Sequence, residues 1–464
     1  MRRFLFCLFL VISATSLLTA SDGPNFVVFL VDDLGYGDLG CYGNRQTPTP
    51  NIDQLANEGI RFTDFHSNGP MCTPTRAALL TGMYQQRFGA MFEGPLSGDT
   101  QYDKGLPLTA FTIAEALKDA GYVTGMFGKW HLGYQPPFLP THQGFDEFRG
   151  LVSGDGDHVS HVDRSGRPDW WQNDKLQHEV GYTAELLTNH SIDFLERHKD
   201  KRFLLYIPHL AIHFPWQTPA DEGYRVHGGN YHNLTKLGDL PSRNVGEKVR
   251  QMITSVDDSL GRIMSAIRKL GLDKKTLVFF LSDNGGYLNY SGGFHNISTN
   301  GVLRGQKVDV YEGGHRVPAI AWWPGRIQPG VSNETIMTFD LFPTFCELAA
   351  PNAKSTTSAL DGQSIANVLF KNATLPQRTL FWKMGREKAV RRGPWKLVVN
   401  QSGQSELFNL ERDISERKDV SDANRTIVNE LESELASWEA EMSSTSGEFG
   451  FKHCSASEAL QELQ

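Results

Sequence analysis

Three features are scarce in this sequence of 464 residues. Cysteine occurs only five times, so at most one or two disulfides can form and packing must stabilise the fold. Lysine and arginine total 45 against 53 aspartates and glutamates, which leaves no basic excess for gripping nucleic acid. No apolar run reaches the roughly 20 residues that span a bilayer. We therefore expect a globular protein that neither binds nucleic acid nor crosses a membrane.

The first twenty residues are typical of a secretory signal peptide. Arg2 and Arg3 precede an apolar run at 4–12, and small and polar residues follow up to Ala20. An N-terminal anchor is the alternative. Removal of residues 1–20 takes away two arginines and no acid, so 43 basic residues then face 53 acidic ones and the net charge is −10. We expect an exported protein, periplasmic or extracellular, or in the lysosomal or secretory pathway of a eukaryote.

Strand-like and helix-like segments alternate along the first three quarters of the chain. Continuous apolar, β-branched runs at 25–31 and 276–281 are typical of strands buried on both faces of a parallel sheet. Further strands are predicted at 122–127, 203–207 and 320–323, and helices at 51–58, 112–120, 182–198, 249–270 and 340–349. This alternation predicts a doubly wound α/β sheet.

The pattern changes toward the C-terminus. Small and polar residues at 351–358 indicate a linker or loop, and short strands at 379–383, 389–392 and 395–399 precede a helical pattern at 427–442. We therefore divide the chain into a signal peptide at 1–20, a large α/β domain at 21–375, and a smaller α+β subdomain with a tail at 376–464.

The two central strands both end in acidic residues. Asp32 and Asp33 follow the first strand, and Asp283 and Asn284 follow the second. In open α/β sheets the ligand site forms at the carboxyl ends of the strands. Carboxylate and amide oxygens suit Ca²⁺ or Mg²⁺ rather than Zn²⁺. The alternative is that these residues cap helices or form turns.

The string P-M-C-T-P-T-R-A-A-L-L-T-G at 70–82 is long and specific. It resembles the signature of type I sulfatases, in which the cysteine is oxidised to formylglycine during export and its hydrate is the nucleophile. By this resemblance Cys72 is the converted residue and Arg76 steadies the hydrate. The alternatives for Cys72 are a buried structural thiol and a thiolate nucleophile.

Further strings resemble sulfatase motifs in the family's order. The stretch at 121–133 carries Lys129 and His131, which point the same way if the chain stays extended there. His213 lies in a weak motif in which Ile212 replaces the usual proline, and His209 is a rival for its role. Lys307 lies in a closely similar string at 303–318, and 406–413 resembles a C-terminal stretch of the family.

The resemblance implies a fold, a reaction and a site. The fold is alkaline-phosphatase-like, with a mostly parallel mixed sheet flanked by helices. The reaction is hydrolysis of sulfate monoesters, and the site uses Ca²⁺, with Mg²⁺ as the alternative, and a partner system that generates formylglycine. Lys129, His213 and Lys307 bind substrate, and His131 and His213 share the acid and base roles. The implied metal ligands are Asp32, Asp33, Cys72, Asp283 and Asn284.

The substrate is open beyond its class. The polar stretch at 153–161 and the pair Trp170 and Trp171 are candidates for a sugar subsite, or else a polar loop and a packing pair. We favour a sulfated carbohydrate over a steroid. Two other functions stay open at this point: a phosphate or phosphonate monoester hydrolase of the same superfamily, and a non-catalytic binder of sulfated glycans in which Cys72 is never converted.

Overall fold

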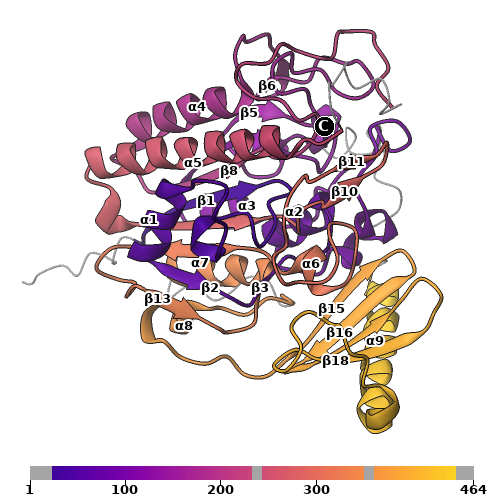
Figure 1. Cartoon of the computed structure of the whole chain (residues 1–464). Coiled ribbons are helices and arrows are strands. Elements are labelled where there is room, and N and C mark those ends of the chain that lie inside the picture. Colours follow the sequence, from indigo (N-terminus) through magenta and orange to yellow (C-terminus); the bar gives the residue numbers. More distant parts are fainter. Residues whose placement is uncertain (1–22, 233–242, 350–359, 446–464) are drawn as a thin grey trace, which may run out of the picture.

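Two adjacent parallel strands form the centre of the molecule (Figure 1). The computed structural model describes residues 23–232, 243–349 and 360–445. Strand β1 (Asn25–Val31) pairs with β9 (Thr276–Ser282) in register from Asn25 opposite Thr276 to Val31 opposite Ser282. Every residue of both strands is buried, as expected for parallel strands covered on both faces.

The main sheet is mixed and has ten strands. Strands β9, β1, β8, β4 and β5 run parallel to one another, whereas β12 is antiparallel to both β9 and β2. The predicted α/β sheet is therefore confirmed. In spatial order the strands are β13 (Gly330–Ser332), β2 (Ile60–Phe62), β12 (Ala319–Trp322), β9, β1, β8 (Phe203–Pro208), β4 (Val123–Lys129), β5 (Glu147–Leu151), β6 (Trp171–Gln172) and β7 (Lys175–Leu176).

Helices cover both faces of this sheet (Figure 1). Alternate residues of β1 enter two separate cores, because successive side chains of a strand point to opposite faces. Phe26, Val28 and Leu30 pack in one core. This core includes residues of α2 (Cys72–Thr81), α3 (Ile113–Asp119), α7 (Leu341–Ala349) and α8 (Ala366–Lys371). Val27 and Phe29 pack in the other core, with α1 (Pro50–Glu58), α4 (Thr183–His198) and α5 (Gly246–Lys269).

A separate antiparallel sheet lies at the C-terminal end of the chain (Figure 1). It consists of β15 (Thr379–Met384), β16 (Glu387–Arg392), β17 (Trp395–Val399) and β18 (Ser405–Asn409), and α9 (Arg425–Thr445) packs on it. Its apolar core includes Ala78 of α2 and Tyr84, which belong to the main domain. The predicted signal peptide at 1–20 and the predicted linker at 351–358 lie outside the described residues. Among the described residues, no helix has the length and apolarity to cross a bilayer.

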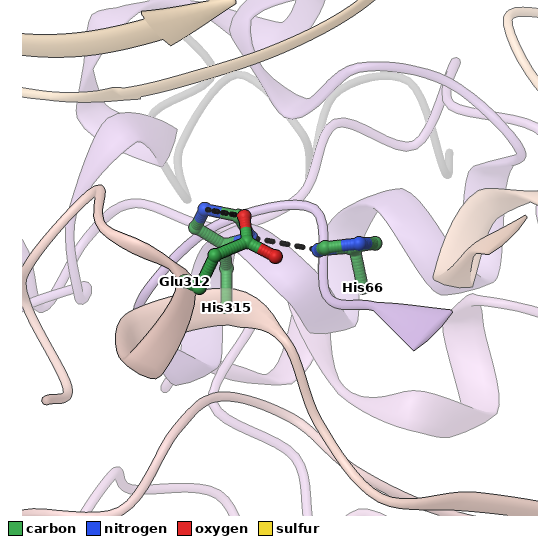
Figure 2. A group of neighbouring side chains, drawn as sticks. All are labelled: His66, Glu312 and His315. Atoms are coloured by element: carbon green, nitrogen blue, oxygen red, sulfur yellow. Dashed lines mark hydrogen bonds and ion pairs between the residues drawn. The ribbon is translucent and has the colours of Figure 1, made fainter. Parts of the chain in front are cut away.

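Buried charged side chains join the C-terminal sheet to the main domain. The ammonium of Lys396, on β17, lies 2.9 Å from a carboxylate oxygen of Glu312 and 2.9 Å from one of Glu416, and all three side chains are fully buried. Glu312 and His315 project from α6 (Glu312–His315), and His66 comes from β3 (Phe65–His66); Figure 2 shows these three side chains together. The two histidines meet with their Nδ1 atoms 2.9 Å apart.

Replacing Lys396 with methionine tests how much this junction stabilises the protein. The change leaves two buried carboxylates without their shared cation, so we expect a loss of about 3–5 kcal/mol in the free energy of unfolding, measured by denaturant titration. The matched control is Lys388→Met, which removes a half-buried pair with Glu439 at 2.7 Å and should cost less than about 1 kcal/mol. Equal losses in the two variants would contradict this account.

Candidate active site

The carboxyl ends of β1 and β9 bring the predicted acidic residues together. Asp32, Asp33 and Asp283 each place a carboxylate oxygen within 4.8 Å of the others, and all three are buried. The Asn284 amide donates to Asp33 Oδ1 at 2.9 Å. Both strands run into loops here rather than into helices, so these residues do not cap helices. The four side chains form one cluster of oxygen ligands.

Two lysines from distant strings meet these carboxylates. Lys129, the last residue of β4, pairs with Asp32, and both are fully buried. Lys307 pairs with Asp33 at 2.5 Å. Burial alone would raise the pKa of Asp32, but the cations Lys129, Arg76 and Lys307 hold that pKa well below its usual range. The lysines therefore keep this carboxylate ionised in the protein interior.

Arg76 bonds the acidic cluster and the end of β4. Its Nε and Nη2 donate to Asp283 Oδ2 at 3.1 and 2.8 Å, and its Nη1 donates to the carbonyl oxygen of Lys129 at 2.5 Å. The hydrogen bonds of its three guanidinium nitrogens therefore hold the acidic cluster and the end of β4, and the expected role of Arg76 in steadying the residue at position 72 stays a prediction.

The cluster has the unmet polar atoms that a bound cation would satisfy. Asp32 Oδ1 and Asn284 Oδ1 are buried and have no hydrogen-bond partner among the described residues. Leaving such atoms unpaired is costly. Burial and the nearby Asp32 carboxylate also raise the pKa of Asp283 to about 7. Hard oxygen donors with unpartnered atoms fit a divalent cation such as Ca²⁺ or Mg²⁺.

Cys72 lies beside this cluster as the first residue of α2. Its sulfur is 3.1 Å from His131 Nδ1, and the other ring nitrogen of His131 donates to the Leu96 carbonyl at 3.0 Å. That donation leaves Nδ1 as an acceptor facing position 72. Burial raises the pKa of the Cys72 thiol, the opposite of what a thiolate nucleophile requires.

Three residues at or next to the site have strained backbone conformations. Asp33, His131 and Val308, which follows Lys307, all have positive φ, at 64°, 57° and 80°. Such conformations are costly for residues other than glycine and are common at functional sites. The expectation of an extended chain from Lys129 to His131 is corrected, because β4 ends at Lys129. Both side chains nevertheless reach the site, through Asp32 and Cys72.

The structure distinguishes the two rival histidines. His213 lines the pocket next to Cys72, and its Nε2 is 3.9 Å from Asp33 Oδ2. Burial and the nearby Lys129 hold the pKa of His213 well below its usual range. His209 instead packs on Phe29, with ring centroids 4.7 Å apart, and its Nε2 bonds the Ser259 hydroxyl at 3.1 Å. His209 is a core residue.

A pocket of about 230 Å³ opens at Cys72. Ser153, Gly154 and Asp155 from the predicted polar stretch line it. The tryptophan pair does not: Trp170 stacks on His161 with centroids 4.4 Å apart, so the packing alternative holds for it. Several lining residues carried no signal in the sequence. One comes from the short strand β10 (Asn289–Tyr290) and the others from loops: Tyr290, and Tyr134, Asp163, Arg164, Arg167, Phe214 and Tyr287.

His66, Glu312 and His315 form a second group with metal-ligand chemistry (Figure 2). Lys396 Nζ lies 2.9 Å from Glu312 Oε1 and 3.1 Å from His315 Nε2. An ammonium at these atoms takes the place that a cation would need. This group is therefore an ion-pair network within the domain junction rather than a metal site.

The fold combines a mixed sheet, a buried carboxylate cluster at the ends of its central strands, and a small antiparallel sheet beside it. This combination defines an alkaline-phosphatase-like hydrolase. The family model described as Sulfatase matches residues 24–351. Arylsulfatase A of Homo sapiens is 35% identical over 395 residues, which cover 79% of this chain and 71% of the relative. N-acetylgalactosamine-6-sulfatase of Mus musculus is 34% identical over 416 residues, covering 84% and 75%.

Solved structures agree with this assignment. The crystal structure of Ps i-CgsB in complex with k-i-k-neocarrahexaose superposes with a TM-score of 0.78 at 29% identity, covering 90% of this chain and 92% of that one. The chain belongs to the sulfatase family, and the family predicted from the sequence motifs is confirmed.

Chelation followed by titration with Ca²⁺ or Mg²⁺ tests the acidic cluster as a metal site. We expect the added ion to raise the melting temperature of the chelated protein, with a stabilisation of about 2.7 kcal/mol at a free concentration of about 100 times Kd. Differential scanning fluorimetry measures this shift. The variant Asp32→Asn should lose the response.

The control for that experiment is Asp257→Asn, which alters a carboxylate elsewhere that accepts from the Ile52 backbone at 2.8 Å. This variant should start from a lower melting temperature but keep the full shift on adding the ion. If Asp32→Asn kept the full response to the ion, the acidic cluster would not be the metal site.

Proposed function

We propose that this sulfatase cleaves sulfate esters of saccharides, with the residue made from Cys72 as nucleophile. The observation that carries the proposal is the position of Cys72. It lies at the start of α2, 3.1 Å from a histidine acceptor and in one pocket with Lys307 and His213. A formylglycine hydrate there supplies two hydroxyls, one to attack sulfur and one whose later deprotonation releases sulfate and restores the aldehyde.

The metal in this proposal is Ca²⁺, with Mg²⁺ as the alternative. Asp32, Asp33, Asp283 and Asn284 would hold it together with the converted residue at position 72. The bound ion supplies positive charge that polarises a sulfate oxygen and favours ionisation of the hydrate. The two unpartnered oxygens of Asp32 and Asn284 support this ligand set.

Lys129, Lys307 and His213 bind the sulfate group in this proposal. The transition state of sulfuryl transfer spreads negative charge over the sulfate oxygens, so fixed cations stabilise it. Lysine ammonium groups are compact point charges that suit a tetrahedral anion. Arg76 steadies the hydrate at position 72 in this proposal, and it also holds the backbone of Lys129 and the Asp283 carboxylate.

The two histidines take different proton-transfer roles. His131 Nδ1 is an acceptor directed at position 72, since its Nε2–H is bound to Leu96. It is placed to take the proton from the second hydroxyl. His213 lies in the same pocket with its Nδ1–H bound to the Phe214 carbonyl at 2.8 Å. Once its Nε2 is protonated it donates a proton to the departing alcohol oxygen, a task that the Lys307 ammonium shares.

A saccharide fits the pocket better than a steroid. The lining alternates polar and charged side chains with aromatic ones, including Ser153, Asp155, Tyr134 and Tyr290, a combination suited to sugar hydroxyls and ring faces. Two relatives point the same way: Ps i-CgsB was crystallised in complex with k-i-k-neocarrahexaose, and another relative is named for N-acetylgalactosamine.

The cellular setting completes the proposal. The signal-like segment at 1–20 directs export, to the periplasm or outside the cell, or into the lysosomal or secretory pathway of a eukaryote. A formylglycine-generating system modifies Cys72 during export. Residues 21–375 form the catalytic domain, and residues 376–464 form a subdomain with a tail.

Mass spectrometry and the variant Cys72→Ser test the nucleophile together. The Cys72 peptide of active protein should carry the mass of an aldehyde, and Cys72→Ser should keep its melting temperature but lose at least about 10³-fold in kcat. A native peptide that is thiol throughout favours the non-catalytic glycan binder. Comparison of nitrophenyl sulfate with nitrophenyl phosphate checks the phosphatase alternative, which a preference for phosphate would support.

Alanine substitution of the two histidines tests the acid–base assignment. His213→Ala should lower kcat by about 10²–10⁴-fold with little change in melting temperature, because the side chain lines the pocket. His209→Ala should lower the melting temperature instead, since it leaves a gap beside Phe29 and an unpaired Ser259, while the folded enzyme keeps its kcat. The reverse pattern would exchange their roles.

A further inference from the structure

The pocket holds another cationic side chain besides the lysines of the sulfate site. Arg164 lines the pocket and is about one-third exposed, with 32% of its side chain accessible. Its Nε donates to Asp155 Oδ2 at 2.6 Å, and its guanidinium carbon lies 5.0 Å from the centroid of the Phe214 ring. Because Phe214 directly follows His213, this guanidinium is anchored next to the reacting position.

Arg164 differs from its neighbour Arg167 in what its terminal nitrogens do. Arg167 donates from Nε to Asp163, from Nη1 to the Gly98 carbonyl and from Nη2 to the Ser165 hydroxyl, so its fork is used within the protein. The terminal nitrogens of Arg164 have no carboxylate or carbonyl acceptor in the part of the chain that the structure describes. The Tyr290 hydroxyl is its other polar neighbour, and an anion is a stronger acceptor than a neutral phenol. The guanidinium is therefore available to an anionic ligand in the pocket.

Two arginines share the Asp155 carboxylate. Besides Arg164, the buried Arg225 donates from Nη1 to the Asp155 backbone oxygen, and its Nη2 lies 3.7 Å from the Asp155 carboxylate. Arg225 is only 1% exposed, and its Nε and Nη2 have no hydrogen-bond partner among the described residues. Guanidinium groups stay charged in proteins. One carboxylate between two of them leaves a net charge of about +1.

We propose that Arg164 is a specificity-determining residue that binds a second anionic group on the saccharide, a carboxylate or another sulfate. This inference rests on the proposed saccharide sulfatase function and extends it. A guanidinium edge binds such groups through two parallel hydrogen bonds. Its contact with Asp155 and its stacking on Phe214 fix its plane, so the site is built before substrate arrives.

Kinetics on matched substrates test the proposal. The set comprises nitrophenyl sulfate, a neutral monosulfated disaccharide, a monosulfated disaccharide with a uronate, and a disulfated disaccharide. Arg164→Ala should lower kcat/KM by about 10- to 100-fold on one or both of the last two, mainly through KM, and by less than about threefold on the first two. Loss on the uronate substrate alone identifies a carboxylate ligand; loss on the disulfated substrate alone identifies a sulfate.

Two variants separate binding from folding. Arg164→Lys keeps the charge but not the paired donors of the guanidinium, so its KM should lie between the values of the wild-type enzyme and Arg164→Ala. Arg167→Ala removes a fork that is already satisfied, so it should lower the melting temperature and change all four kcat/KM values by the same factor.

Three results would overturn the inference. One is an equal loss on all four substrates in Arg164→Ala, and another is no loss on any of them. The third is wild-type enzyme that cleaves nitrophenyl sulfate but no disaccharide. That result overturns the proposed substrate class as well, whereas the first two leave it intact.

Discussion

The structure depends on the burial of three carboxylates at one point. Asp32, Asp33 and Asp283 stand at the ends of two adjacent strands, where they repel one another and are shielded from water. Such a cluster is stable only when opposite charges surround it. The compensating cations come from three different segments of the chain: Lys129 at the end of β4, Lys307 before α6, and Arg76 within α2. Three of the sulfatase-like strings, at 70–82, 121–133 and 303–318, are therefore held in place by the same electrostatic requirement.

The need to hold these cations around the carboxylates also gives the C-terminal sheet a role, although the sheet does not enter the site. The helix α2 carries Cys72 and Arg76, and its Ala78 packs in the apolar core of the C-terminal sheet. Trp382, on β15, donates to the backbone of Ser67 at 2.9 Å, a few residues before Cys72. Lys396 then ties the sheet to α6, which follows Lys307. Two segments of the active site are thus supported from behind by one buried junction.

The sequence predicted what depends on local pattern and missed what depends on tertiary contacts. The apolar runs identified β1 and β9. The acidic residues after them could be recognised as a candidate site because, in open α/β sheets, the ligand site forms at the carboxyl ends of the strands. His209 and His213 could not be told apart, since both follow the same strand and only the course of the loop directs one into the pocket. Arg164 and Tyr290 lie more than 120 residues apart in the chain, with no motif to join them. Trp170 looked like a sugar platform, yet packing against His161 determines its position.

The charge of the site resolves the difficulty of drawing a sulfate ester to an acidic protein. The three carboxylates and the three cations around them sum to zero, and the lysines are tied to Asp32 and Asp33. A divalent ion held by the carboxylates would bring the net charge of the same site to +2 and would leave the ammonium groups of Lys129 and Lys307 free to face an anion. A local field of this kind outweighs the net charge of −8 on the whole chain. With such an ion the acidic cluster would support an anion-binding site, because it would then gather more positive charge than it contributes negative charge.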